Sequence, residues 1–238
     1  MTINRSNSLN QIQAITDVWC DAAPGCTAAP DAGGCASAAD AALRIGADRI
    51  AVPAAAVHLT WAWLENKGIE ILAVMDGGGF KEDGQGAEKL SEHIRSVLKK
   101  GADGIMLCAW AGGKIRTAAR IFEIADALAP VRNDLFFEKK LFVGMSLENI
   151  EPLDWPDIFR NLKKMGADGV LFSLTPVSGK GKNIAGKIFG ALENWDCGFA
   201  GRIMFLADSP ADIESALRLV EKIKPDFVKK LRFFIRHK

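Results

Sequence analysis

Two loops rich in glycine and lysine are the best candidates for binding an anion. The stretch "TPVSGKGKN" (175–183) contains Ser178, Gly179, Lys180, Gly181 and Lys182, and it follows an apolar run. Small residues let backbone N–H groups approach an anion closely, and lysine adds positive charge. Lys114 lies in a similar stretch, "AWAGGKIRT" (109–117). We predict that these residues bind the phosphate group of a small metabolite; a solvated basic loop is the alternative explanation.

Carboxylates follow several apolar runs of the sequence. Asp76 precedes three glycines, Glu148 ends "LFVGMSLE" (141–148) and Asp208 ends "RIMFLAD" (202–208), with Asp21 in a similar place after the first run. Carboxylates in one ring can serve as general acid and base, or bind a divalent metal. We predict Asp76, Glu148 and Asp208 as catalytic residues. No cofactor is predicted and a divalent metal is left open. Helix capping and turn formation are the alternative explanation for any single one of these Asp residues.

A repeated joint predicts the elements that position these residues. "IGADRIAV" (45–52), "KGADGIML" (100–107) and "MGADGVLF" (165–172) each place Gly-Ala-Asp between an amphipathic segment and a short apolar run. Glycine commonly ends a helix because it adopts the left-handed backbone conformation without strain. A run that is apolar throughout is typical of a parallel strand covered on both faces. Each copy is therefore predicted to be the junction of a helix and a strand.

Seven clear strand candidates alternate with helical patterns along the chain, and they predict an α/β fold. The expected strands are 14–22, 49–53, 69–76, 104–110, 141–148, 169–174 and 202–208, with a weaker eighth at 226–235. Such alternation indicates parallel pairing through right-handed crossovers, and this number of units fits a (β/α)8 TIM barrel. We predict one such domain over residues 1–238, with an atypical or incomplete last unit. A doubly wound open sheet is the alternative, but no GxGxxG motif follows the first strand.

The bulk composition limits the classes of partner. Thirty basic and 29 acidic residues leave a net charge of +1, which gives no reason to expect nucleic acid or a membrane surface as a partner. The basic end "KKLRFFIRHK" is interpreted as a short solvated tail. No apolar run is long enough to span a bilayer and no signal peptide is evident, so a cytoplasmic location is expected. Oligomeric state is left open, with a homo-oligomer as one alternative.

Several of these motifs together resemble the deoxyribose-phosphate aldolase family of class I aldolase barrels, over roughly residues 26–175. "CTAAPDAGGCASAADAALRIGADRIAVPAAAV" is similar to that family's first loop, first helix and second strand. "GADGIMLCAWAGGK" is similar to its fourth strand and lysine loop, and "GADGVLFSLTPVSGKG" to its sixth strand and phosphate loop. The resemblance implies a TIM barrel and reversible aldol cleavage of a sugar phosphate through a lysine Schiff base, without metal.

The chain departs from this family where the chemistry would be. Leu171 stands where the family has its Schiff-base lysine, and Met106 replaces the acidic residue of the fourth strand. The seventh strand lacks the second lysine and the glycine pair after it. Two hypotheses follow. The first is an enzyme of the lyase or isomerase type on a small phosphorylated sugar or keto acid, which works without a Schiff base. The alternative is a non-catalytic or regulatory barrel that retains the ligand pocket.

Overall fold

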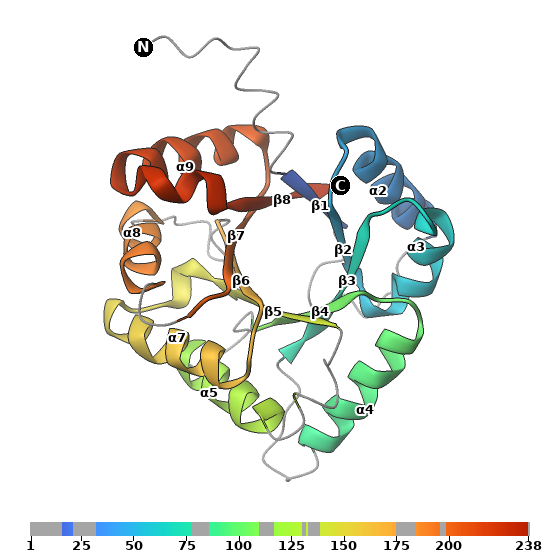
Figure 1. Cartoon of the computed structure of the whole chain (residues 1–238), viewed down its shortest axis with the longest axis horizontal. Coiled ribbons are helices and arrows are strands. Elements are labelled where there is room, and N and C mark those ends of the chain that lie inside the picture. The colour runs from blue at the N-terminus through green and yellow to red at the C-terminus, as the bar shows by residue number, and fades with distance from the viewer. Residues whose placement is uncertain are drawn as a thin grey trace.

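A closed barrel of parallel strands forms the centre of the protein (Figure 1). The computed structural model describes residues 16–20, 32–77, 86–109, 117–129, 132, 139–174, 184–195 and 199–237. The strands are β1 (Thr16–Cys20), β2 (Arg49–Pro53), β3 (Glu70–Asp76), β4 (Gly104–Cys108), β5 (Lys140–Ser146), β6 (Gly169–Ser173), β7 (Arg202–Ala207) and β8 (Arg232–His237). Each strand pairs in parallel with the next one in the chain, and β8 pairs with β1. The predicted (β/α)8 barrel is thereby confirmed.

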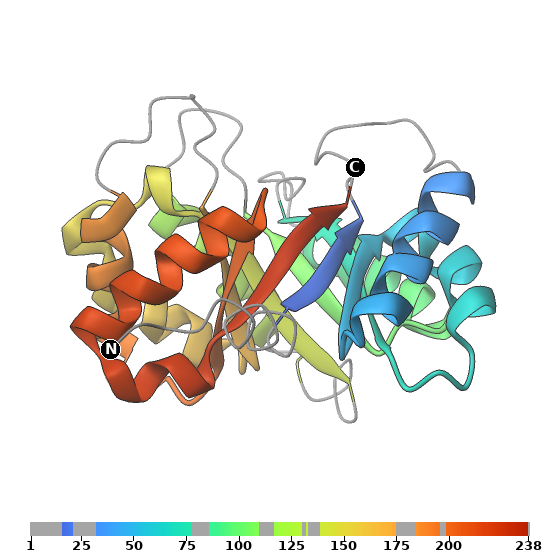
Figure 2. The same cartoon turned by 90° about the horizontal axis from the view of Figure 1, so that it is seen from above.

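Helices surround the strands on the outside of the barrel, as the view across the barrel in Figure 2 also shows. Those in the described residues are α2 (Ala32–Ile45), α3 (Val57–Leu64), α4 (Gly86–Lys99), α5 (Thr117–Leu128), α7 (Trp155–Lys164), α8 (Ile184–Trp195) and α9 (Pro210–Ile223). Short 3-10 helices lie at η1 (Ala54–Ala56), η4 (Leu147–Asn149), η5 (Pro152–Asp154) and η6 (Pro225–Lys230). None of the helices described is long and apolar enough to cross a lipid bilayer.

The Gly-Ala-Asp joints connect helices to strands as predicted. Gly46, Gly101 and Gly166 have φ angles of 66°, 103° and 63°, the left-handed conformation that ends a helix. Two of the three Asp residues hold adjacent strands together. Asp103 Oδ2 accepts a hydrogen bond from the Ile71 N–H at 2.9 Å, and Asp168 Oδ2 accepts one from the Leu141 N–H at 2.7 Å. These two joints therefore end a helix and fix the next strand beside the preceding one, whereas Asp48 of the first joint pairs with Arg232 of β8.

The last strand differs from its prediction. The segment 226–235 was expected to be the strand, but Pro225–Lys230 forms η6 and β8 begins only at Arg232. The interpretation of the basic end as a solvated tail is also wrong, because β8 runs to His237 and buries Phe233 and Phe234. Ser37 on α2 and the ring of His237 are joined by a 2.8 Å hydrogen bond between Oγ and Nε2. The eighth strand is thus complete and closes the barrel.

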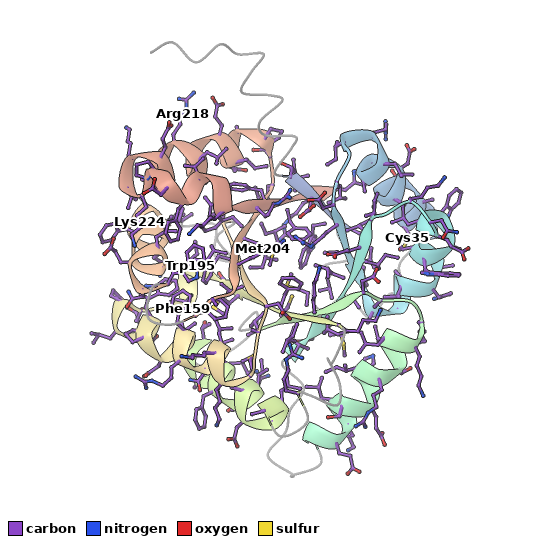
Figure 3. All side chains as sticks on the ribbon, in the orientation of Figure 1. Cys35, Phe159, Trp195, Met204, Arg218 and Lys224 are labelled. Carbon is purple, nitrogen blue, oxygen red and sulfur yellow. The ribbon has the colours of Figure 1, made fainter. Side chains whose placement is uncertain are left out.

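Two apolar layers stabilise this arrangement. Side chains that alternate along each strand point either outward to the helices or inward to the barrel axis. The outward side chains and the inner faces of the helices form the larger core, which includes Phe159 and Trp195. The inward side chains form a second cluster, which includes Met204. Figure 3 shows Met204 on the inner side of β7, whereas Phe159 and Trp195 lie on its outer side among the helices.

Candidate functional site

The middle of the barrel is lined by apolar side chains in the part of the chain that is described, and the Arg49 guanidinium borders them, 5.9 Å from the centre of the Phe142 ring. The inward side chains form one apolar cluster, which consists of Trp19, Ala51, Leu72, Met106, Cys108, Phe142, Leu171, Met204, Leu206 and Phe234. Leu171 is 0% exposed and pairs in register with Met204 of β7 and Gly144 of β5. The position that resembles the aldolase lysine is therefore filled by a side chain that cannot form a Schiff base, and its surroundings exclude water.

Solvent reaches the interior from the carboxyl end of the strands. Pro53 and Val74 are inward residues paired in register near the ends of β2 and β3, and both are partly exposed. Leu72, one inward position before Val74, is fully buried. The accessible part of the barrel thus stops just above the apolar cluster. In TIM barrels this end is where catalytic and binding residues lie.

The three predicted catalytic carboxylates all lie at this end, but on separate strands. Asp76 is the last residue of β3 and is exposed. Glu148 lies in η4, directly after β5, and is half-buried, whereas Asp208 directly follows β7 and is exposed. β3 and β7 lie on opposite sides of the barrel in Figure 1, so Asp76 at the end of β3 and Asp208 after β7 belong to opposite sides of the carboxyl end. Within the described ranges, no three His, Cys, Asp or Glu side chains come together as metal ligands.

Asp208 has a cationic partner that the sequence interpretation missed. Arg236 lies on β8 two residues beyond Phe234, which belongs to the interior cluster, so its side chain also points inward. Its Nε is 3.0 Å from Asp208 Oδ1, and the Arg236 side chain is 19% exposed. Phe234 and Arg236 are two residues apart on one strand and so point to the same side, and this spacing is the sequence signal that would have revealed Arg236 as an inward residue. Assigning the basic end to a solvated tail concealed this spacing.

Glu148 also lies beside a positive charge. Its backbone N–H donates a 3.3 Å hydrogen bond to Ser146 Oγ, which fixes the start of η4. The Lys187 ammonium group of α8 donates a hydrogen bond to the Glu148 carbonyl oxygen. Lys187 therefore lies at the carboxyl end of the barrel, near the end of β5, and the sequence interpretation missed it as well. Ser178, Gly179, Lys180, Gly181, Lys182 and Lys114 lie outside the described residues, so their role stays a prediction.

The opposite, amino end of the barrel is closed by a network of charges. Asp17 is fully buried, and its Oδ1 accepts hydrogen bonds from the N–H groups of Asp48 (3.1 Å) and Arg49 (3.0 Å). The Arg49 guanidinium lies 3.8 Å from Asp17 Oδ2 and donates a 2.8 Å hydrogen bond to Glu70, which also pairs with Lys140. In TIM barrels, residues at this end serve stability and not chemistry.

Burial and pairing change the acidity of these two carboxyl groups in opposite directions. Removal from water raises the pKa of Asp17 to about 6, although Arg49 and Arg232 oppose the shift. Burial also acts to raise the pKa of Glu70, but hydrogen bonds from Lys140 and Arg49 outweigh it and lower the pKa below its usual value. The amino end thus contains one carboxyl group whose pKa is raised to about 6 and one whose pKa is lowered.

Comparison with known proteins places the fold. No family model matches the chain, and no curated protein matches it in sequence. A presumed deoxyribose-phosphate aldolase from Toxoplasma gondii has a similar structure, with 16% sequence identity and a TM-score of 0.69 over 98% of this chain and 91% of that one. The chain shares the fold of the deoxyribose-phosphate aldolases. The resemblance seen in the sequence is confirmed at the level of the fold.

Other similar structures extend the range of functions. The deoxyribose-phosphate aldolase of Aeropyrum pernix, a tetramer, has 11% identity and a TM-score of 0.60 over 86% of this chain and 84% of that one. A presumed copper homeostasis protein, CutC of Streptococcus agalactiae, has 10% identity and a TM-score of 0.58 over 93% and 97% of the two chains. Proteins with such different names share this barrel, so function has to be argued from the site.

Proposed function

We propose that this chain acts on a small phosphorylated sugar or keto acid at the carboxyl end of its barrel, by proton transfer and without a Schiff base. The observation that supports this most directly is the contrast inside the barrel. An apolar cluster fills the level of Leu171, while Asp76, Glu148 and Asp208 lie at the carboxyl end above it. Charged groups thus lie at both ends of the barrel, and those at the carboxyl end are the ones that a small ligand can reach.

Two carboxyl groups at such a site suit an isomerase or a lyase. One carboxylate removes a proton from the carbon next to the substrate carbonyl, and the electron pair moves to the carbonyl oxygen to give an enediolate. A carboxylic acid then protonates the former carbonyl carbon, while the proton of the adjacent hydroxyl moves to the enediolate oxygen and the new carbonyl forms, which completes an isomerisation. We assign these roles to Asp76 and Glu148. The loop 178–182 and Lys114 remain the proposed phosphate ligands, and a divalent metal at the carboxylates remains an open alternative.

A non-catalytic barrel that binds a phosphorylated ligand is the second candidate. It is favoured by the fully buried Leu171 and Met106, which replace the lysine and the acid of the aldolase pattern with well-packed apolar side chains. Complete burial indicates that the interior is stable without those two groups. Self-association into a homo-oligomer, as in the tetrameric Aeropyrum pernix enzyme, stays a prediction that sedimentation equilibrium would test.

A proton-exchange assay separates the two candidates. The protein is incubated in D2O with a panel of ketose phosphates and phosphorylated keto acids, and ligand binding and exchange at the carbon next to the carbonyl are followed by 1H NMR. An enzyme of the proposed kind exchanges or converts at least one ligand that binds. Asp76→Asn and Glu148→Gln should retain binding and lose about 100-fold or more of the rate. Binding without exchange or conversion of any ligand would support the non-catalytic barrel.

A further inference from the structure

Arg236 and Asp208 form a charged pair at the carboxyl end of the barrel, on adjacent strands. Ala207 and Ile235 are paired in register, so the next residues of β7 and β8 lie directly opposite each other. Arg236 also pairs in register with Trp19 of β1, whose ring belongs to the interior cluster. The guanidinium therefore lies at the upper edge of the apolar cluster, at the level where a ligand that enters the barrel would stop.

The carboxylate of Asp208 and an anionic ligand would compete for the same cation. Asp208 is held on the adjacent strand, so its effective concentration at Arg236 is at least millimolar. A ligand with a carboxylate group would replace the Asp208 carboxylate at Arg236 by a group of the same charge, so the attraction to Arg236 would not increase. A phosphate monoester carries nearly two negative charges above pH 7 and presents three oxygens to the planar guanidinium, which binds such groups through two parallel hydrogen bonds.

From this arrangement we propose that the Arg236–Asp208 pair selects phosphate monoesters over carboxylates. Arg236 contributes one cationic ligand to the phosphate group, and Asp208 acts as an internal competitor that excludes singly charged acids. The pair would thus explain why the substrate must have a phosphate group, whether it is a sugar or a keto acid. This inference rests on the proposed function for the location of the ligand, but it concerns binding alone and does not require turnover.

Binding of two ligands with one carbon skeleton tests the selection. Calorimetric titration at pH 8 compares glycerol 3-phosphate with glycerate, which has a carboxylate and no phosphate. The wild-type protein should bind glycerol 3-phosphate at least about tenfold more tightly than glycerate. Arg236→Met should weaken binding of glycerol 3-phosphate by about 10- to 100-fold. Asp208→Asn should tighten binding of glycerate about tenfold or more, because the internal competitor is gone.

A second arginine–carboxylate pair provides the control. Arg218 pairs with Glu214 on α9, and both side chains are exposed on the outer surface, where Figure 3 shows Arg218. Arg218→Met should leave both affinities unchanged. Melting curves report whether each variant folds, and if Arg236→Met does not, Arg236→Lys should still weaken glycerol 3-phosphate several-fold because the planar fork is lost.

Three results would overturn the selection. They are equal binding of both ligands by the wild-type protein, no binding of glycerol 3-phosphate at all, and unchanged glycerate binding in Asp208→Asn. Binding as inferred, with no proton exchange in D2O, would leave the selection standing and contradict only the proposed enzymatic activity.

Discussion

At the scale of single residues, Leu171 occupies the position where the aldolase pattern has its Schiff-base lysine. Its side chain is fully buried in the cluster with Met106 and Met204. Leu171→Ala would leave a cavity there, and we expect the free energy of unfolding to fall by about 2–5 kcal/mol. Leu171→Met keeps the volume and should cost less than about 1.5 kcal/mol. Urea unfolding measures both, and equal losses in the two variants would contradict the packing described.

Asp17 gives a prediction about pH. Since burial raises its pKa to about 6, the native state holds more protons than the unfolded state between about pH 4 and pH 6. The contribution of Asp17 to the free energy of unfolding therefore falls as the pH rises through that range. A shift of about two units corresponds to about 3 kcal/mol. In Asp17→Asn this fall is absent. The free energy of unfolding of the variant, relative to that of the wild type, should therefore rise by about 3 kcal/mol from pH 4 to pH 7.

Glu70→Gln should show the opposite pH dependence of the free energy of unfolding. Urea unfolding at several pH values measures this dependence for both variants. The pKa of Glu70 is lowered in the native state, so its stabilising contribution is present at neutral pH and is lost as the pH falls. The free energy of unfolding of Glu70→Gln relative to wild type should accordingly fall from acid to neutral pH. A difference between Asp17→Asn and wild type that stays constant with pH would show that Asp17 titrates normally.

At the scale of elements, the Gly-Ala-Asp joint depends on the backbone conformation of its glycine. Gly46 has a φ of 66° and no neighbouring atom within 4 Å of where a Cβ would stand, so Gly46→Ala adds backbone strain without a clash. We expect a loss of about 1–2 kcal/mol in the free energy of unfolding. Gly34 lies in α2 with equal space around it, and Gly34→Ala should instead stabilise by up to about 1 kcal/mol. Chemical denaturation that gives both changes the same sign would contradict this account.

Elements defined by local pattern were predicted well from the sequence. β2 (49–53) has the expected bounds, since a Gly-Ala-Asp joint precedes it. The bounds of β8 were predicted wrongly, because they depend on its pairing with β1 at the other end of the chain. No pattern within the sequence of β8 indicates that pairing. The same error concealed Arg236, whose inward direction depends on the register of that strand. Leu171 was identified from the sequence because the resemblance to the aldolase family located its position. Lys187 could not be identified in this way, because its contact with the Glu148 carbonyl oxygen depends on the packing of α8 against η4.

At the scale of the whole molecule, β8 closes the barrel between β7 and β1. Phe233 packs outward and Phe234 inward, and both are fully buried. A chain that ends at Leu231 lacks both rings, each of which would cost about 3–5 kcal/mol if truncated to Ala. We expect this chain to lose cooperative thermal unfolding and near-UV circular dichroism. Removal of Lys238 alone should leave both unchanged, and a cooperative transition in the shorter chain would show that closure by β8 is dispensable.

Reduction with borohydride tests the central claim, that the barrel works without a Schiff base. The protein is incubated with aldehyde and ketose phosphates, reduced with sodium borohydride and analysed by intact-mass and peptide mass spectrometry. With Leu171 in the apolar interior, we expect no stoichiometric adduct on any single lysine. One reduced adduct per chain that maps to one lysine would contradict the claim and return the protein to Schiff-base chemistry.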